Sequence, residues 1–242
     1  MRLLQERFRA TISMAIPDNC SDKRLDKQSS EQDFITRADM LGCALHRDEH
    51  KYRDTEMARI TIKAADPQWP QAFERIAQQL QNTLTTLALR IDHIGSTSVP
   101  GLPAKDVIDI QITVNSIGHP EIAKKLTQAG YLHLPEIQSD NLVGENADSP
   151  ELKKLYFREK PGEREAHIHI REAGRLNQKY PLLFRDFLRQ DVMVRDAYAK
   201  VKQELAARFP DDADSYYAIK DPYMDTIYRA ACLWQAGKIS RR

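Results

Sequence analysis

Residues 107–114 read VIDIQITV, and this stretch decides the fold. Successive side chains of a β-strand point to opposite faces of its sheet, so clean alternation places one set of residues against a core. The apolar set consists of Ile108, Ile110, Ile112 and Val114. Asp109 and Gln111 lie on the opposite face. The stretch therefore predicts a central strand that is buried under helices on one side and carries a single carboxylate on the other.

Helices and strands alternate on both sides of this strand. Asp66-Pro67 is a favourable helix start, an N-cap followed by proline at the first helical position, and apolar residues recur at helical spacing from there to Leu87. Further helices are expected at residues 120–129, from residue 180 onward and, as the final helix, from Asp221-Pro222. Further strands are expected at residues 60–62, 91–94, 131–134, 152–158 and 166–171. The pattern predicts an α/β (α+β) fold, a mixed β-sheet with flanking helices and a C-terminal helical region.

The charge balance argues against two classes of partner. The 242 residues include 36 Lys and Arg against 35 Asp and Glu, a formal net charge of +1. This balance gives no general field that attracts nucleic acid or an anionic membrane surface. No stretch approaches the roughly 20 apolar residues needed to span a bilayer. Any recognition of phosphate must therefore be local.

The cysteines and the first residues indicate a compartment. Cys20, Cys43 and Cys232 are odd in number and show no CxxC or Cys/His ligand spacing, which argues against a disulfide framework and against structural zinc. Residues 1–16 mix Arg and Glu among their apolar residues, unlike a signal peptide. We therefore expect a cytoplasmic protein.

The chain divides near Met57. Residues 17–33 are polar and highly charged and read as a linker, and a short helix is expected from Phe34 to Leu45. We therefore expect residues 1–57 to be a partly disordered N-terminal extension and residues 58–242 to be the folded domain.

A Gly-Ser pair and a downstream aspartate form the first candidate site. Gly95-Ser96 follows the expected strand at residues 91–94, and Asp109 lies in the central strand. A small turn after a strand leaves backbone N–H groups and hydroxyls free to cradle phosphate oxygens, and a nearby carboxylate can hold the accompanying Mg²⁺. The alternative is an ordinary tight turn followed by a buried, hydrogen-bonded aspartate.

A second candidate lies on the strand at residues 166–171, which carries His167, His169 and Arg171 on one face. These groups can meet Asp109 in one cleft that suits a phosphate or a divalent ion. The alternative is a solvated sheet face with ordinary alternation.

The third candidate is a pair of arginines. Arg185 and Arg189 lie four residues apart on one helical face and can grip a triphosphate. The alternative is an exposed charged face in which Asp186 is a partner. Lys220 has the same two interpretations, a phosphate ligand or a solvated lysine.

The motif HIGSTSVPGL-x-AK-x-x-IDI, residues 93–110, resembles the signature of the GrpB family, which is related to the nucleotidyltransferase superfamily. That superfamily has a Gly-Ser pair, a spacer and a strand of the form Asp-hydrophobic-Asp/Glu-hydrophobic. Here twelve residues, 97–108, separate Ser96 from Asp109. Further family-like elements are Asp66-Pro67-x-Trp69, His167-x-His169, Phe184-Arg185-Asp186-x-Leu188-Arg189 and Tyr216-x-x-x-Lys220.

The resemblance implies a nucleotidyltransferase-like protein that binds a nucleoside triphosphate with Mg²⁺ and transfers a nucleotidyl group to an unknown acceptor. It implies that Asp109 holds the metal and is catalytic, together with His169 in preference to His167. The implied contacts to nucleotide and phosphate come from Gly95, Ser96, Thr97, Lys105, Arg185, Arg189 and Lys220.

Gln111 departs from the superfamily pattern. The second carboxylate is expected there, and a neutral amide is a poor ligand for Mg²⁺. Transfer with two metals needs several carboxylates, so this position favours an alternative, a non-catalytic accessory or binding module such as the GrpB-like domains fused to dephospho-CoA kinases. If the protein does transfer nucleotides with a metal, replacing Gln111 with Glu is expected to add a hard oxygen ligand on the face of Asp109 and to tighten Mg²⁺ binding.

Overall fold

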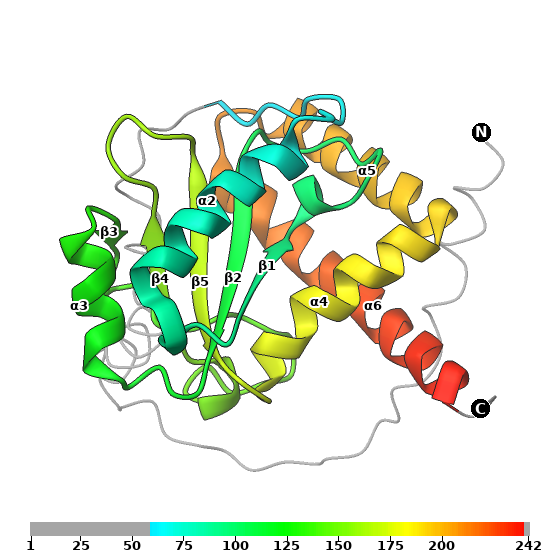
Figure 1. Ribbon diagram of the computed structural model, residues 1–242. Helices are drawn as coiled ribbons and strands as arrows, with labels where there is room; N and C mark the ends of the chain where they lie inside the picture. The colour runs from blue at the N-terminus through cyan, green and yellow to red at the C-terminus, as the bar shows by residue number, and fades with distance from the viewer. Residues whose placement is uncertain (1–58, 240–242) are drawn as a thin grey trace, which may run out of the picture. The chain divides into compact units, whose positions relative to one another are not determined.

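The computed structural model describes residues 59–239, and Figure 1 shows the sheet and helices that they form. The predicted extension and its short helix lie outside this range. Within it, no helix is both long enough and apolar enough to cross a membrane.

Five strands form one mixed sheet. In spatial order they are β1 (Arg90–Ile94), β2 (Ile108–Val114), β5 (Ala166–Glu172), β4 (Lys154–Arg158) and β3 (Leu132–His133). The β2–β5 pair is parallel and the other three pairs are antiparallel. The parallel register places Asp109 opposite His167 and Gln111 opposite His169. The polar residues of both central strands therefore share one face.

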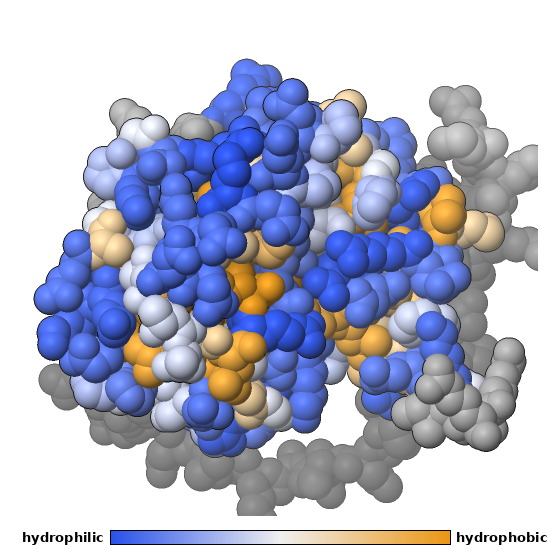
Figure 2. Space-filling model, viewed as in Figure 1, coloured by the Kyte–Doolittle hydropathy of each residue, from blue (hydrophilic) through white to orange (hydrophobic). Residues whose placement is uncertain are grey.

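The other face of the sheet lies under two helices. These are α2 (Trp69–Leu84) and α3 (Pro120–Gln128), and α2 lies in front of the sheet in Figure 1. Ile108, Ile110 and Ile112 are fully buried in this layer, which confirms the prediction made from their alternation. Figure 2 shows that the outward sides of α2 and α3 are largely hydrophilic, as amphipathic helices require.

Three consecutive helices make the predicted C-terminal helical region. They are α4 (Leu176–Gln190), α5 (Val192–Arg208) and α6 (Ala213–Ile239). Their inward side chains build a second apolar cluster around Phe184, Tyr198 and Ile227. Short 3₁₀ turns complete the described chain: η1 (Thr85–Leu87), η2 (Ser96–Ser98) and η3 (Pro150–Leu152). The α/β fold class is confirmed.

Three expected helix starts were wrong. Helix α4 begins at Leu176, four residues before the expected position. Helix α2 begins at Trp69, two residues after Pro67, and the Asp66 side chain accepts a hydrogen bond from the Gln68 backbone N–H (2.8 Å) in the turn just before the helix. Helix α6 does not begin at Pro222 but runs through it. Proline removes one helical hydrogen bond, and packing of α6 against two separate apolar clusters on either side of Pro222 offsets that loss.

The expected strand at residues 60–62 is also absent from the described chain. Only Lys63 forms an isolated bridge, to Ala104. The Ile60 N–H instead donates to the Pro210 carbonyl (2.7 Å), so this segment is held by the helical region rather than by the sheet.

Candidate functional site

Gly95 and Asp109 lie against each other at the end of β1. Ile94 pairs with Asp109 across the ladder, so the chain enters the Gly95-Ser96 turn directly beside the carboxylate. Gly95 has φ +68°, and a Cβ built on it would lie 2.7 Å from Asp109 Cγ. Only glycine fits this position without displacing Asp109. The turn and the aspartate are therefore neighbours, as the motif spacing predicts.

A cavity of about 370 Å³ opens on the polar face of the sheet, between the strands and the helical region. The sequence-predicted residues that line it are Gly95, Ser96, Thr97, Lys105, Asp109, His169 and Lys220. Most of the predicted site residues thus converge on one concave space, as is typical of ligand sites.

Asp109 is an anionic group in the cavity wall. His167 Nδ1 lies 3.4 Å from its Oδ1, and its side chain is 29% exposed. Burial raises the pKa of the carboxyl group, but the hydrogen bond with His167 and the charges of His167, Lys105 and Lys220 outweigh it and hold the pKa below its ordinary value. Asp109 is therefore ionised at neutral pH, and its imidazole partner is His167, not the favoured His169.

Lys202, on α5, reaches the turn from the opposite wall. Its Nζ donates to Ser96 Oγ (2.8 Å) and to the Pro103 carbonyl (2.6 Å), and the residue is 2% exposed. Burial, together with the charge of Lys220, lowers the pKa of the ammonium group to about 7 against a smaller opposing effect of Asp109. The amine therefore changes protonation near neutral pH.

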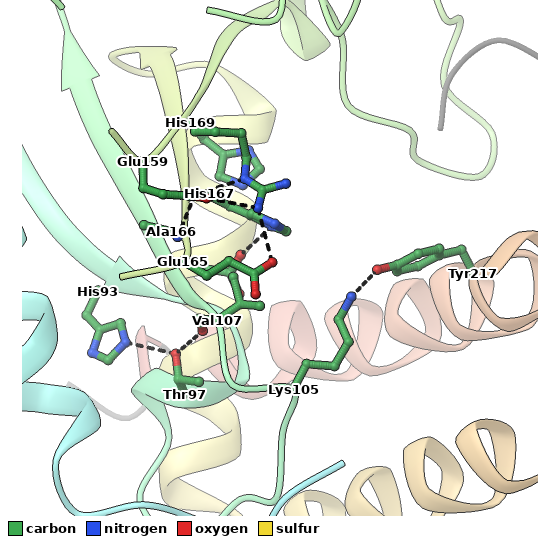
Figure 3. A network of polar contacts seen from close by, with 12 residues as sticks. His93, Thr97, Lys105, Val107, Glu159, Glu165, Ala166, His167, His169 and Tyr217 are labelled. Carbon is green, nitrogen blue, oxygen red and sulfur yellow. Dashed lines mark hydrogen bonds and ion pairs between the residues drawn. The ribbon is translucent and has the colours of Figure 1, made fainter. Parts of the chain in front are cut away.

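Two further lysines lie close to one aromatic ring, that of Tyr217. Lys105 donates to the hydroxyl of Tyr217, a contact drawn in Figure 3, and its Nζ lies 5.1 Å from the ring centroid. Lys220 Nζ also lies 5.1 Å from that centroid and pairs with Asp221 at 2.8 Å. Although burial opposes it, the influence of Tyr198 and Asp221 raises the pKa of Lys220. Lys220 is therefore charged but already paired.

Arg171 organises the far end of the polar face. Its Nε and Nη2 donate to the two oxygens of Asp140 (2.9 and 3.0 Å), and its Nη1 donates to Gln111 Oε1 (2.8 Å). Gln111 Nε2 donates in turn to the Gln178 carbonyl (2.9 Å). Gln111 is fully buried, and both ends of its amide have partners. Its side chain is therefore turned toward Arg171 and is not part of the cavity wall.

His169 is held neutral at this end. Its Nδ1 lies 3.3 Å from Arg171 Nη2 and 3.4 Å from Lys154 Nζ. Burial and the charges of these two cations lower its pKa well below the ordinary value. Because both neighbours can only donate, Nδ1 accepts and the imidazole proton resides on Nε2. His169 therefore has its donor on Nε2 and no free basic nitrogen.

Thr97 supports the turn from within. Figure 3 shows its hydroxyl between His93 and Val107. The hydroxyl donates to the Val107 carbonyl (3.1 Å), so His93 Nε2 must donate to it (3.0 Å). Burial, with smaller effects from Arg189 and Arg185, lowers the pKa of His93 to about 4 despite the charge of Asp109. Both hydrogen bonds of the Thr97 hydroxyl therefore hold the turn in position.

Arg185 and Arg189 are not part of the cavity wall. Arg185 Nη1 donates to the His93 carbonyl (2.9 Å), and Arg189 donates through Nε and Nη2 to the Ser98 carbonyl (3.1 and 2.6 Å). The two side chains do share one face of α4, as their spacing predicts. That face meets the backbone on both sides of the Gly-Ser turn, so the arginines clamp the turn from outside.

The donors present do not fit a divalent-metal cluster of the nucleotidyltransferase type. Asp109 is one carboxylate and faces His167, and the position of the second carboxylate is Gln111, whose oxygen binds Arg171. Within residues 59–239, no three His, Cys, Asp or Glu side chains gather as a metal site. One carboxylate does not provide the set of hard oxygen ligands that Mg²⁺ requires.

Comparison with known proteins places the chain in a family. A family model described as GrpB protein matches residues 59–230. The chain belongs to the GrpB family. The crystal structure of the conserved protein GrpB from Enterococcus faecalis is 31% identical, with a TM-score of 0.59, and the match covers 71% of this chain and 96% of that one. UPF0157 protein BH1888 from Halalkalibacterium halodurans is 30% identical, over 72% of this chain and 83% of its own length.

GrpB-type sequence also occurs within longer proteins. A protein named dephospho-CoA kinase from Mycobacterium tuberculosis is 35% identical over 232 residues, which is 88% of this chain and 57% of the kinase. The chain thus spans little more than half the length of that relative. The GrpB assignment predicted from the motif at residues 93–110 is confirmed.

Sequence reasoning missed two residues of this GrpB site. Lys202 carried a usable signal, because it lies four residues after Tyr198 and three before Leu205, on the buried side of α5, where lysine is unusual. Asp140 carried no signal in the sequence. It precedes β4 in an irregular segment, and only the fold brings it to Arg171.

Proposed function

We propose that this GrpB domain binds a nucleotide in the 370 Å³ cavity and acts as a binding module without a metal cluster. The observation that carries the proposal is the convergence of the Gly95-Ser96 turn with Lys105 and Lys202 around one concave space. The phosphates lie against the turn and the lysines. Backbone N–H groups, a hydroxyl and ammonium groups are the donors that phosphate oxygens need.

The distance along β5 suits the rest of a nucleotide. His167, beside Asp109, and Arg171 are four residues apart, which corresponds to about 13 Å along a strand. At the Arg171 end, Asn177 lines the cavity and is 3% exposed. Its Nδ2 donates to Asp140 and to the Lys153 carbonyl, while its buried Oδ1 has no protein donor. That oxygen is suited to accept a hydrogen bond from a nucleoside N–H or O–H.

A ligand screen by thermal unfolding tests the proposal. A ligand that binds only the folded state stabilises it by mass action, by about 2.7 kcal/mol at one hundred times its Kd. The screen contains ATP, GTP, CTP and UTP, each with EDTA and with excess Mg²⁺. It also contains dephospho-CoA, because a relative is named dephospho-CoA kinase. A nucleotide that raises Tm in the presence of EDTA supports the binding module, and no shift with any compound contradicts nucleotide binding.

The second candidate is metal-dependent nucleotidyl transfer to an unknown acceptor. The position of Asp109 beside the Gly-Ser turn favours it, since this is the arrangement that the superfamily pattern implies. Incubation with each nucleoside [α-³²P]triphosphate and Mg²⁺, with a lysate fraction as acceptor, tests it. Label that is transferred by the parent protein and not by Asp109→Asn would favour transfer over simple binding.

A further inference from the structure

When protonated, Lys202 is a buried cation without an anionic partner in contact. Its Nζ hydrogen-bonds two neutral oxygens, Ser96 Oγ and the Pro103 carbonyl, and lies 4.8 Å from the ring centroid of Tyr198. None of the described carboxylates lies within 4.0 Å of it. A buried ammonium group that is not paired with an anion is costly to maintain. An anion bound beside Lys202 would therefore stabilise its protonated form.

Lys105 presents the same feature on the other side of the turn. It donates to the neutral hydroxyl of Tyr217 and forms no ion pair within the described chain. Lys220 differs, because Asp221 already neutralises it at 2.8 Å. Two of the three cavity lysines near the turn are thus available to an incoming anion.

Both available lysines act on the same point of the cavity. Lys105 and Lys202 each interact electrostatically with Asp109, and Ser96, which Lys202 contacts, follows the glycine that abuts this carboxylate. A single aspartate cannot neutralise two ammonium groups. The wall around the turn is therefore positive where the nucleotidyltransferase pattern calls for carboxylates and metal.

We propose that Lys202, Lys105 and Ser96 form a phosphate-binding site that takes the phosphate chain of the ligand directly, without a divalent cation. This inference rests on the nucleotide binding proposed above and names how the phosphates are held. The ammonium groups provide the positive charge that Mg²⁺ provides in metal-dependent nucleotidyl transfer, and the Ser96 hydroxyl, which accepts from Lys202 Nζ, has its own proton to donate to a phosphate oxygen.

Isothermal titration of the full chain with ATP and, separately, with inorganic tripolyphosphate tests the site, each with EDTA and with excess Mg²⁺. Tripolyphosphate has no nucleoside, so it reports on the phosphate site alone. We expect both probes to bind in EDTA, and Mg²⁺ to weaken their binding because it competes with the lysines for the same oxygens. Lys202→Met and Lys105→Met should each weaken binding by about tenfold or more, as expected for a lost hydrogen bond to a charged group.

Lys200→Met is the matched control, because Lys200 is on the same helix, is exposed and pairs with Glu204. It should change affinity by less than about twofold. Binding that requires Mg²⁺, or that survives Lys202→Met, would overturn the inference. If tripolyphosphate binds in EDTA but ATP does not, the phosphate site stands and the nucleotide proposal fails. If neither probe binds under any condition, both fail.

Discussion

The carboxylate of Asp109 occupies the space that a side chain at residue 95 would need. A Cβ on Gly95 would lie 2.8 Å from Asp109 Cβ and 2.7 Å from its Cγ. Because Asp109 Cβ is fixed by the central strand, rotating the carboxylate does not relieve the overlap. The turn that approaches the ligand and the acid that faces it are therefore a single packed unit.

Gly95→Ala should lower the free energy of unfolding by about 2 to 6 kcal/mol, the sum of the backbone strain at φ +68° and ψ −173°, a conformation almost restricted to glycine, and the overlap with Asp109. Urea unfolding measures the change. Gly162→Ala is the control, since Gly162 has a similar φ of +79° and no atom within 4 Å of the added Cβ. That variant should lose only about 1 to 2 kcal/mol. Equal losses in the two variants would show that Asp109 does not crowd Gly95.

Lys202→Met should stabilise the protein more at pH 6 than at pH 9. Burial lowers the pKa of Lys202 from 10.5 to about 7, so between these values the folded state binds fewer protons than the unfolded state and stability rises with pH. The free-energy cost of burying the protonated Lys202 is fully present below pH 7. Each pH unit in this window is worth about 1.4 kcal/mol, so the advantage of the variant should shrink by on the order of 2 kcal/mol.

Urea unfolding of parent and variant at both pH values measures this difference, and effects of other groups cancel in the comparison. Lys200→Met should show no such pH dependence, because Lys200 is solvent-exposed. A constant difference between Lys202→Met and the parent from pH 6 to pH 9 would mean that Lys202 titrates normally.

Gln111→Glu should not create a Mg²⁺ site, contrary to the expectation from the sequence pattern. The side chain at this position binds Arg171 and donates to the Gln178 carbonyl, so a glutamate there loses the donor and pairs with the arginine. We expect a loss of about 1 to 2 kcal/mol in the free energy of unfolding. Titration of the variant with ATP at increasing Mg²⁺ checks the other half of the prediction. Affinity that rises with Mg²⁺ only in the variant would show that the carboxylate reaches the ligand.

Arg185→Met should affect stability rather than ligand affinity. Arg185 is 12% exposed in its side chain and binds the His93 carbonyl next to the turn, so its removal should cost about 1 to 3 kcal/mol. Arg208→Met, which removes an exposed arginine from α5, is the control and should cost less than about 0.5 kcal/mol. A large loss of ATP affinity in Arg185→Met with unchanged stability would instead place this arginine on the phosphates.

Much of the fold follows from local patterns in the sequence. The alternation in residues 107–114 predicts the central strand and its buried face, since period-two burial needs no knowledge of distant residues. The start of α6 could not be found in this way. Pro222 is a local signal for a helix start, and it is overridden by packing of residues on both sides of it.

The site was predictable where one motif contains all its parts. Gly95 and Asp109 meet because β1 and β2 are antiparallel neighbours in the sheet. Ile94, at the end of β1, pairs with Asp109, so the next residue, Gly95, lies beside the carboxylate. The roles of the two arginines could not be predicted. Helical spacing shows that Arg185 and Arg189 share a face, but it does not show what that face contacts. Gln111 stands at an expected ligand position but binds Arg171, which lies 60 residues away on the parallel strand β5, so this role could not be found from local sequence.

The affinity of Asp109→Asn for ATP in EDTA tests the central claim, phosphate binding by lysines without a metal, most directly. The variant keeps the shape of the side chain but removes its negative charge from a wall that faces phosphate. If the lysines hold the phosphates, affinity should rise by about three- to tenfold, because the repulsion from one partly exposed charge is worth on the order of 1 kcal/mol. Loss of binding in Asp109→Asn, together with a requirement for Mg²⁺ in the parent protein, would show instead that Asp109 holds a metal.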